Sequence, residues 1–207
     1  MKRTNLVHLL TLSLIATPVA ANTMPNGKPY LFGTLGYVQA EDEEDSPGVI
    51  ITKNDGTINV SVGAGFALNE FVAFEATYLK SGDIKQAAIF PDDGISVDLS
   101  TTFHGGGPGV VATLPINEHL SFFVRADYLY LNVDNKFKAT DENGNEGSLK
   151  LSSSGWNNAF GAGVQYKLNN DLTIRGQWRL TQLEQTLAGE KVETDLNEFS
   201  MGILKAF

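Results

Sequence analysis

The feature that most limits the fold is an uninterrupted alternation of side-chain type over residues 57–68. One side of this segment carries Ile58, Val60, Val62, Ala64, Phe66 and Leu68, and the other carries Asn59, Ser61, Gly63, Gly65 and Ala67. A period of two is that of an extended strand, whose successive side chains point to opposite faces. The segment is therefore predicted to be a strand, about twice as long as the average strand of soluble proteins.

Similar segments recur along the chain, and they predict eight strands, at residues 30–39, 57–68, 71–80, 96–114, 120–134, 149–168, 172–184 and 198–207. Three connections are short, at residues 69–70, 115–119 and 169–171, and four are long and polar, at residues 41–56, 81–94, 135–148 and 185–193. Long and short connections alternate, as they do when neighbouring antiparallel strands are joined alternately at two opposite ends.

Strands of this length are long enough to cross a lipid bilayer when they are tilted. In lipid every backbone donor and acceptor must be paired, so an antiparallel sheet persists there only when it closes on itself. Eight strands close into a narrow barrel whose interior is filled by side chains. The sequence thus predicts an all-β fold, an eight-stranded antiparallel up-and-down transmembrane β-barrel formed by residues 22–207.

The amino terminus has the pattern of a secretory signal peptide over residues 1–21. Lys2 and Arg3 precede an apolar run at residues 6–15, and Ala21 is the expected cleavage point. The run is too short for a membrane-spanning helix. Without the two basic residues the formal charge changes from -9 to -11, which argues against nucleic-acid binding. The absence of cysteine excludes a fold stabilised by disulfides.

The faces opposite the apolar ones carry charged residues, which a closed barrel would place in its lumen. We expect a polar lumen network of Glu75, Arg125, Asp127, Arg175 and Arg179, because buried charges require partners. The contact expected first is that of Glu75 with Arg125 or Arg175. His104, Gln165, Lys167 and Gln177 are assigned to the same inward side. In a soluble sheet these charges would form a solvated face, but the apolar faces would then need a second layer that the chain does not provide.

Four segments resemble the small outer-membrane β-barrel superfamily represented by the OmpA transmembrane domain and OmpX. They are residues 30–37 (YLFGTLGY), 63–79 (GAGFALNEFVAFEATYL), 160–179 (FGAGVQYKLNNDLTIRGQWR) and 199–207 (FSMGILKAF). The peptidoglycan-binding domain that follows the barrel in OmpA has no counterpart among these segments. The resemblance implies a bacterial outer-membrane location, with outer-membrane lipids and lipopolysaccharide as partners. It also implies that the barrel assembly machinery recognises the last strand through an assembly signal formed by Phe199, Met201, Ile203 and Phe207.

Three functions are compatible with this pattern. The first is a non-enzymatic barrel that is structural or interacts with its surroundings through four extracellular loops. The second is a barrel that binds or passes a small apolar ligand, for which a gap in the lumen network would be the distinguishing feature. The third, less favoured, is a lipid-modifying barrel enzyme. His104 begins an HGGG sequence, but the G-x-S-x-G nucleophile motif that accompanies it in esterases does not occur.

No cofactor or metal site is predicted from the sequence. Residues 141–147 resemble the start of a calcium-binding loop, but Glu146 occupies the position that requires glycine. The acidic run at residues 41–45 could bind divalent cations that bridge lipopolysaccharide, although such runs are usually solvated loops.

Overall fold

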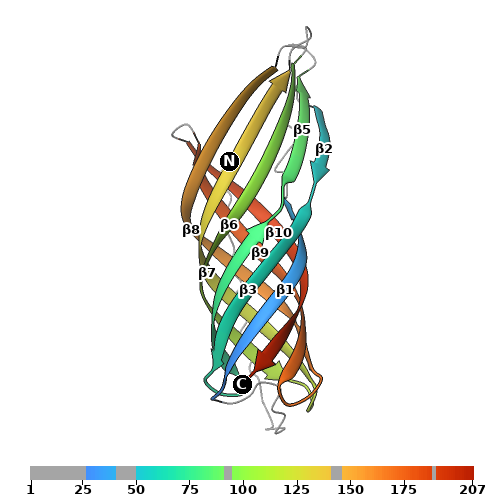
Figure 1. Cartoon of the computed structure of the whole chain (residues 1–207), viewed down its shortest axis with the longest axis vertical. Coiled ribbons are helices and arrows are strands. Elements are labelled where there is room, and N and C mark those ends of the chain that lie inside the picture. Colours follow the sequence, from blue (N-terminus) through green and yellow to red (C-terminus); the bar gives the residue numbers. More distant parts are fainter. Residues whose placement is uncertain (1–26, 41–49, 91–94, 141–145, 188–189) are drawn as a thin grey trace, which may run out of the picture.

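The computed structural model describes residues 27–40, 50–90, 95–140, 146–187 and 190–207 (Figure 1). The predicted signal peptide and the acidic run at residues 41–45 lie outside these ranges. The strands are β1 Pro29–Ala40, β2 Ile50–Asp55, β3 Thr57–Ala67, β4 Val72–Ser81, β5 Ile84–Phe90, β6 Ile95–Pro115, β7 Leu120–Thr140, β8 Glu146–Lys167, β9 Leu172–Leu187 and β10 Glu190–Ala206.

The prediction of a closed eight-stranded antiparallel barrel is confirmed. The antiparallel pairs are β1–β3, β3–β4, β4–β6, β6–β7, β7–β8, β8–β9, β9–β10 and β10–β1. Because the last pair joins β10 to β1, the ring has no free edge. β2 and β5 are not additional strands of the ring. β2 is separated from β3 by Gly56 alone, and β5 follows β4 closely and also pairs with β6.

The loops are shorter than the sequence predicts. Parts of all four are paired strand: β2 and β5 lie within the first two, β7 continues to Thr140, β8 begins at Glu146, and the β9–β10 pairing reaches Leu187 and Glu190. Polar sequence favours a loop, but it also fits a hairpin that stands in water. Outside a membrane both faces of a hairpin are solvated, so polar side chains are compatible with a hydrogen-bonded ladder.

Three hairpins close one end of the barrel, here called the turn end, and each is built around an asparagine. The side-chain oxygen of Asn69 accepts hydrogen bonds from the backbone N–H groups of Phe71 and Val72, both at 2.8 Å. Asn117 and Asn169 accept equivalent pairs of bonds from the residues two and three positions later. Asparagine is favoured at turns for this bonding to its own backbone. The opposite end, where β7 and β8 extend farthest, is called the loop end.

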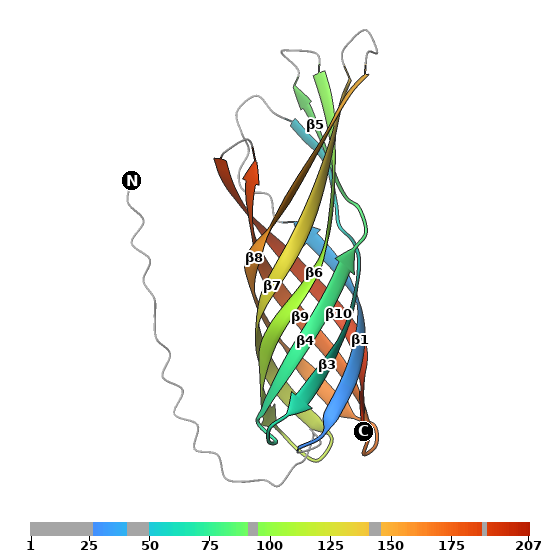
Figure 2. The same ribbon diagram turned by 60° about the vertical axis from the view of Figure 1, so that its left-hand side comes forward.

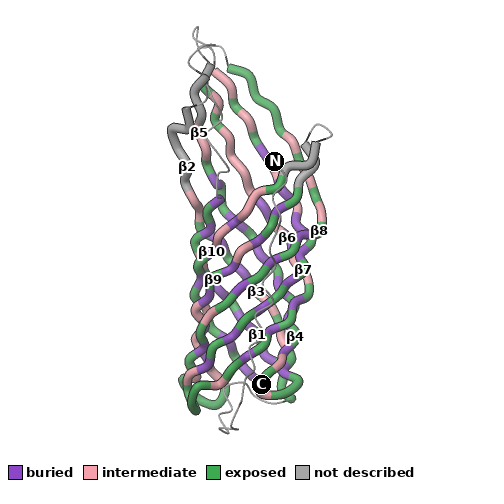
Figure 3. Tube along the Cα trace, turned by 180° about the vertical axis from the view of Figure 1, so that it is seen from behind, coloured by how far each residue is buried: buried purple, intermediate pink, exposed green. Residues whose placement is uncertain are grey.

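The outside of the barrel is apolar. Buried and exposed residues alternate along the strands of the closed ring, as the sequence predicts (Figure 3). Exposed large hydrophobic residues include Leu35, Val62, Phe74, Val124, Phe160 and Met201. An apolar surface of this extent around a closed sheet is typical of a barrel that faces lipid. Among the described residues, no helix has the length and hydrophobicity needed to cross a membrane.

The interior contains two apolar clusters with polar residues between them. The cluster near the turn end consists of Tyr30, Phe32, Ala67, Ala73, Val111, Phe123, Leu204 and Ala206. The cluster toward the loop end consists of Val38, Ala40, Leu79, Ile84, Phe103, Leu129, Leu131, Val133, Ala159, Leu183 and Leu196. The interior is therefore a packed core rather than a uniformly polar lumen, which the expectation of a polar network did not anticipate.

Glycines opposite inward aromatic side chains make this core possible. Gly65 pairs with Tyr30 across β1 and β3, and a Cβ atom at Gly65 would lie 2.2 Å from the Tyr30 ring. Gly163 has the same relation to Phe123, at 2.8 Å. The rings occupy the space that a Cβ atom of the neighbouring strand would need, so a narrow barrel holds large side chains.

At the loop end the sheet divides into two branches. The last described pair between β8 and β9 is Asn158 with Gln182, whereas β8 remains paired with β7 up to Glu146. Figure 2 shows the β9–β10 hairpin pointing away from β7 and β8 beyond this level. The longer branch, called the extension, comprises β2, β5 and residues 95–102, 134–140 and 146–152 of β6, β7 and β8.

Candidate functional site

Glu75 of β4 lies at the centre of the polar layer between the two apolar clusters. Its carboxylate accepts a hydrogen bond from the Tyr30 hydroxyl at 2.7 Å. It also accepts two bonds from the guanidinium of Arg175, at 2.7 and 3.1 Å, in the two-pronged geometry that suits a carboxylate. Nη2 of Arg125 lies 3.5 Å from Oε2 of the same carboxylate. Glu75 thus contacts both arginines that the sequence offered as alternatives.

Arg125 of β7 connects Glu75 to the rest of the layer. Its Nε and Nη2 atoms donate to the two carboxylate oxygens of Asp127, each at 2.8 Å. Its Nη1 donates to Gln177 at 3.1 Å, and Gln177 donates in turn to the Ser200 hydroxyl at 3.1 Å. Because Arg125 and Asp127 are two residues apart on one strand, both side chains point inward from the same face.

Arg175 is fully buried and is held on several sides. Its guanidinium carbon lies 4.8 Å from the ring centre of Phe123 and 5.5 Å from that of Phe32, within the range of cation–π attraction. With the amide of Gln165 oriented so that its oxygen faces the guanidinium, that oxygen accepts bonds from Nε at 3.1 Å and Nη2 at 2.8 Å. The aromatic rings of the turn-end cluster therefore form one wall of the ionic layer.

A second, smaller polar group lies nearer the loop end. Arg179 of β9 donates through Nη2 to Glu198 of β10, and Asn59 donates to the same carboxylate at 2.6 Å. Among the described side chains, Nε and Nη1 of Arg179 and Oε1 of Glu198 have no hydrogen-bond partner. This group is as deeply buried as the Glu75 group, but its hydrogen bonds are less complete.

The buried charges of the described residues balance. Three arginines (Arg125, Arg175 and Arg179) face three acids (Glu75, Asp127 and Glu198), so the net charge of the interior is zero. An ion in this environment is stable only when it is paired and hydrogen-bonded. The interior set is therefore suited to closing and stabilising the barrel, because its ions are engaged with one another.

All five residues proposed from the sequence lie inside, although Arg179 belongs to the smaller group. Tyr30 and Glu198 were not among them. The sequence does contain a signal for Glu198, because this residue directly precedes the outward Phe199 and therefore faces inward. Tyr30 carried no such signal, because an aromatic residue on a barrel strand is usually assigned to the lipid face.

The assignment of His104 to the inward side is wrong. It lies on the same face of β6 as the exposed residues Pro108 and Val110, while the inward neighbours are Phe103 and Gly105. The glycine-rich sequence that follows hid the alternation of β6. His119 is at the turn end, where its ring lies against Tyr166 and contacts the Lys167 carbonyl oxygen at 3.1 Å. In the described ranges no three His, Asp or Glu side chains are grouped in a way that could hold a metal ion.

Three residues of the proposed assembly signal lie on the outer face of β10, and Phe207 directly follows the end of that strand. Phe199, Met201, Ile203 and Phe207 are each more than half exposed. Lys205, on the same face, contacts Asp171 of the neighbouring hairpin at 3.4 Å. The end of the chain therefore presents an exposed apolar row that is interrupted by one cation, Lys205.

Comparisons with known proteins agree with this architecture. The structure is similar to that of Neisserial surface protein A (NspA), with a TM-score of 0.54 and 12% sequence identity, covering 86% of this chain and 97% of that one. It is also similar to outer membrane protein OprG from Pseudomonas aeruginosa, with a TM-score of 0.55 and 11% identity, covering 90% and 99%. Likeness at these identities shows a shared fold. A sequence comparison with curated proteins found no match.

The family assignment rests on a sequence model rather than on these structures. The model of the outer membrane protein beta-barrel domain matches residues 7–204, which is nearly the whole chain. The closed ring, the apolar exterior and the balanced charged interior are the features expected of such a domain in a membrane. The chain belongs to the family of outer membrane protein beta-barrel domains.

Proposed function

We propose that this outer-membrane barrel is a non-enzymatic protein that does not conduct through its interior and that acts through its loop end. The observation that carries the proposal is the closed interior. Tyr30, Glu75, Arg125 and Arg175 cross-link β1, β4, β7 and β9 through the centre of the barrel. Apolar clusters lie on both sides of this layer. What remains for interaction is the surface, and the extension is its largest part outside the apolar band.

Conductance measurement tests this proposal directly. The purified protein, inserted in a planar bilayer, should show no steady conductance, and liposomes containing it should not take up small sugars. A porin inserted under the same conditions is the positive control. A reproducible ohmic conductance proportional to the number of inserted barrels would overturn the proposal.

A barrel that binds a small apolar ligand remains the second candidate. The observation in its favour is the apolar cluster toward the loop end, which includes Leu131, Val133 and Leu183. These side chains are nearly fully buried against one another, so a ligand would have to displace them. An apolar fluorescent probe should then bind the wild-type barrel and bind the Leu183→Asn variant more weakly. This result would favour the alternative if the variant and the wild type have the same thermal stability in the same detergent.

The absence of catalysis is part of the same proposal. It is supported by the positions of the two described histidines, His104 on the outer face and His119 at the turn end, which do not share a site. Incubation with lipid A and phospholipids should yield no acyl-chain release or transfer. A single turnover product detected by mass spectrometry would contradict it.

We further propose that residues 1–21 are a cleaved signal peptide and that the barrel assembly machinery recognises the outer row of β10. The exposure of Phe199, Met201, Ile203 and Phe207 supports the second point. Replacing Phe207 with serine should lower the amount of folded protein in the outer membrane, with Phe71→Ser at the same end of the barrel as the control. Equal amounts of both variants in the membrane would contradict a specific signal.

A further inference from the structure

A row of lysines crosses the outer face of the extension. Backbone pairing aligns Lys85 of β5 with Ser100 of β6, Ser100 with Lys136 of β7, and Lys136 with Lys150 of β8. All three lysines are exposed, and Lys138 follows on the same face of β7. We call Lys85, Lys136 and Lys150 the lysine row. A chain with a formal charge of -9 thus concentrates positive charge on one patch.

The row continues the face that contacts lipid. On β7, Tyr128 and Tyr130 have the same facing as Lys136, and on β8 Trp156 has the same facing as Lys150, because each pair is separated by an even number of residues. Trp156 stacks on Tyr128 at 4.6 Å between ring centres and meets Tyr130 edge-on at 5.4 Å. Such an aromatic group is typical of the boundary between lipid chains and headgroups.

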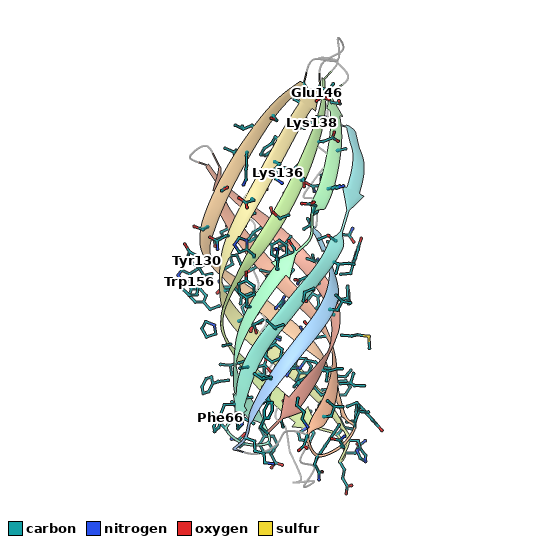
Figure 4. The ribbon with its side chains drawn as sticks, viewed as in Figure 1. Phe66, Tyr130, Lys136, Lys138, Glu146 and Trp156 are labelled. Carbon is teal, nitrogen blue, oxygen red and sulfur yellow. The ribbon has the colours of Figure 1, made fainter. Side chains whose placement is uncertain are left out.

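The lysine row stands just above that boundary. Figure 4 shows Lys136 above Tyr130 and Trp156, and Lys138 and Glu146 higher still. Six residues of strand correspond to about 20 Å along the strand and, at the usual tilt, to a height of roughly 15 Å. Groups attached to the headgroups of lipids beside the barrel would lie at this height.

The row has too few anionic partners within the described residues. Lys138 contacts Glu146 at 2.8 Å, and Lys150 lies 3.5 Å from Asp134. Lys85 and Lys136 have no carboxylate within ion-pair distance in the described ranges. Lys136 and Lys150 moreover lie directly opposite each other, and like charges in that position destabilise a sheet. An anion lying over the pair would offset this repulsion.

A hollow of about 780 Å³ adjoins the lysine row. Its lining includes all four lysines together with the acidic residues Asp98 and Glu146, so its charged lining has a net charge of +2. Ser100, between Lys85 and Lys136, offers a hydroxyl in the middle of the row. The patch thus combines positive charge with hydroxyl and backbone groups, which suits a phosphorylated or carboxylated sugar better than a simple ion.

We propose that the lysine row binds the anionic inner core of a lipopolysaccharide molecule that lies beside the barrel in the outer leaflet. Phosphate or carboxylate groups of the core sugars contact Lys85, Lys136 and Lys150, while the acyl chains lie against the apolar face below Tyr130 and Trp156. This site deepens the proposed function and rests on it, because it requires the loop end to face outward. It differs from a binding site at the loop tips, because it faces sideways along the membrane.

The test uses the full-length mature protein, purified in lipopolysaccharide-free detergent. Binding of purified rough lipopolysaccharide with a phosphorylated core is compared for wild type, for the triple variant Lys85→Gln, Lys136→Gln, Lys150→Gln, and for a control triple variant. The control, Lys28→Gln, Lys167→Gln, Lys205→Gln, has the same change of charge at the turn end. Boiling-dependent gel mobility checks that each variant is folded before binding is measured.

The lysine-row variant should bind about tenfold more weakly, since each exposed ion pair contributes a fraction of a kcal/mol. The control should bind like wild type, and enzymatic removal of the core phosphates should abolish the difference between the variants. Unchanged affinity of the lysine-row variant would overturn the proposal, and so would an equal loss in both triples. Tighter binding of a soluble sulfated polysaccharide with the same lysine dependence would also overturn it, by identifying a soluble partner.

A separate measurement distinguishes failure of this site from failure of the proposed function. Protease added to intact cells should cleave within the extension when the loop end faces outward. Cleavage without lysine-dependent binding would overturn only the lipopolysaccharide site. No cleavage on intact cells, with cleavage after the outer membrane is opened, would overturn the orientation and the proposal together.

Discussion

The barrel interior and the outer face of the extension use the same kinds of charged side chain in opposite ways. Inside, the three arginines and three acids balance, and Glu75 alone receives bonds from Tyr30 and Arg175 and an ion pair from Arg125. On the outside, lysines outnumber their acidic neighbours and two of them face each other across β7 and β8.

The difference shows that burial decides whether a charged side chain must be paired within the protein. A buried ion without a partner costs several kcal/mol, so the interior set has to be neutral and interlocked, and it contributes to closure of the fold. An exposed lysine costs little, so an unbalanced row persists and stays free to bind an anion. The choice of residue follows the same rule, because arginine forms fixed two-pronged contacts whereas lysine acts as a mobile point charge.

The largest effect that would break this contrast comes from Glu75. Replacing Glu75 with alanine leaves Arg175 and Arg125 buried without their shared carboxylate, so we expect the free energy of unfolding to fall by about 3–5 kcal/mol. Urea unfolding in lipid vesicles, followed by tryptophan fluorescence, measures this change. Glu118→Ala, at an exposed turn position, is the control and should change stability by less than about 0.5 kcal/mol. A loss at Glu75 no greater than that of the control would show that the layer is not cooperative.

The Arg179–Glu198 group should give a smaller effect, because several of its polar atoms lack partners in the described structure. Arg179→Met leaves Glu198 with Asn59 alone and should cost about 2 kcal/mol or more. The double variant Arg179→Met, Glu198→Met removes both charges and should recover most of that loss, because well-packed apolar residues often replace a buried ion pair without cost. A double-mutant cycle from urea unfolding gives the coupling energy. Additive losses would contradict the pairing.

Replacing Lys136 should change the free energy of unfolding slightly, and in the stabilising direction. In lipopolysaccharide-free detergent, Lys136→Gln removes repulsion with Lys150 and should raise the free energy of unfolding by up to about 0.5 kcal/mol. In vesicles containing lipopolysaccharide the same variant should be equal to or less stable than wild type. Ser100→Gln, at the neighbouring position of the row, controls for the new amide. Destabilisation of Lys136→Gln in the lipid-free sample would indicate that the lysine has an internal partner.

The smallest effect concerns the pH response of the extension. The Ser152 hydroxyl, which donates to Asp134 at 2.5 Å, lowers the pKa of Asp134, and nearby Lys150 acts in the same direction. The hydrogen bond therefore contributes to stability above the ordinary pKa and is lost as the pH falls through the lowered value. The midpoint of the Asp134 carboxylate in an NMR titration should lie below its ordinary value of about 3.9, and Ser152→Ala should raise it. An identical midpoint in the variant would show that the bond is not formed in solution.

Much of the fold follows from alternation and spacing. The unbroken period of residues 57–68 predicted β3, and the alternation of long and short connections predicted a closed ring of eight strands. The facing of Glu75, Arg125, Asp127, Arg175 and Arg179 followed from the same period. The alternation failed at β6, where glycines around His104 carry no facing signal. It also failed at the ends of β7 and β8, where the outward residues are lysines and serines, which are typical of a loop.

The partners inside the barrel were not predictable at the same level. Two arginines were equally plausible for Glu75, and the sequence did not show that both contact it together with Tyr30. Pairing across the barrel depends on the relative heights of β4, β7 and β9, which are set by the stagger of strands around the closed ring. Local sequence contains no direct measure of that stagger.

By itself, then, the sequence determined the facing of most strand side chains, with His104 and Tyr30 as exceptions, because a strand has only two faces and the more apolar one meets the membrane. Only the tertiary structure decided which inward groups touch and which outward groups align, including the meeting of Lys85, Lys136 and Lys150 in one row. The physical reason is that facing is a property of each strand alone, whereas contacts across strands depend on how all eight are registered when the barrel closes.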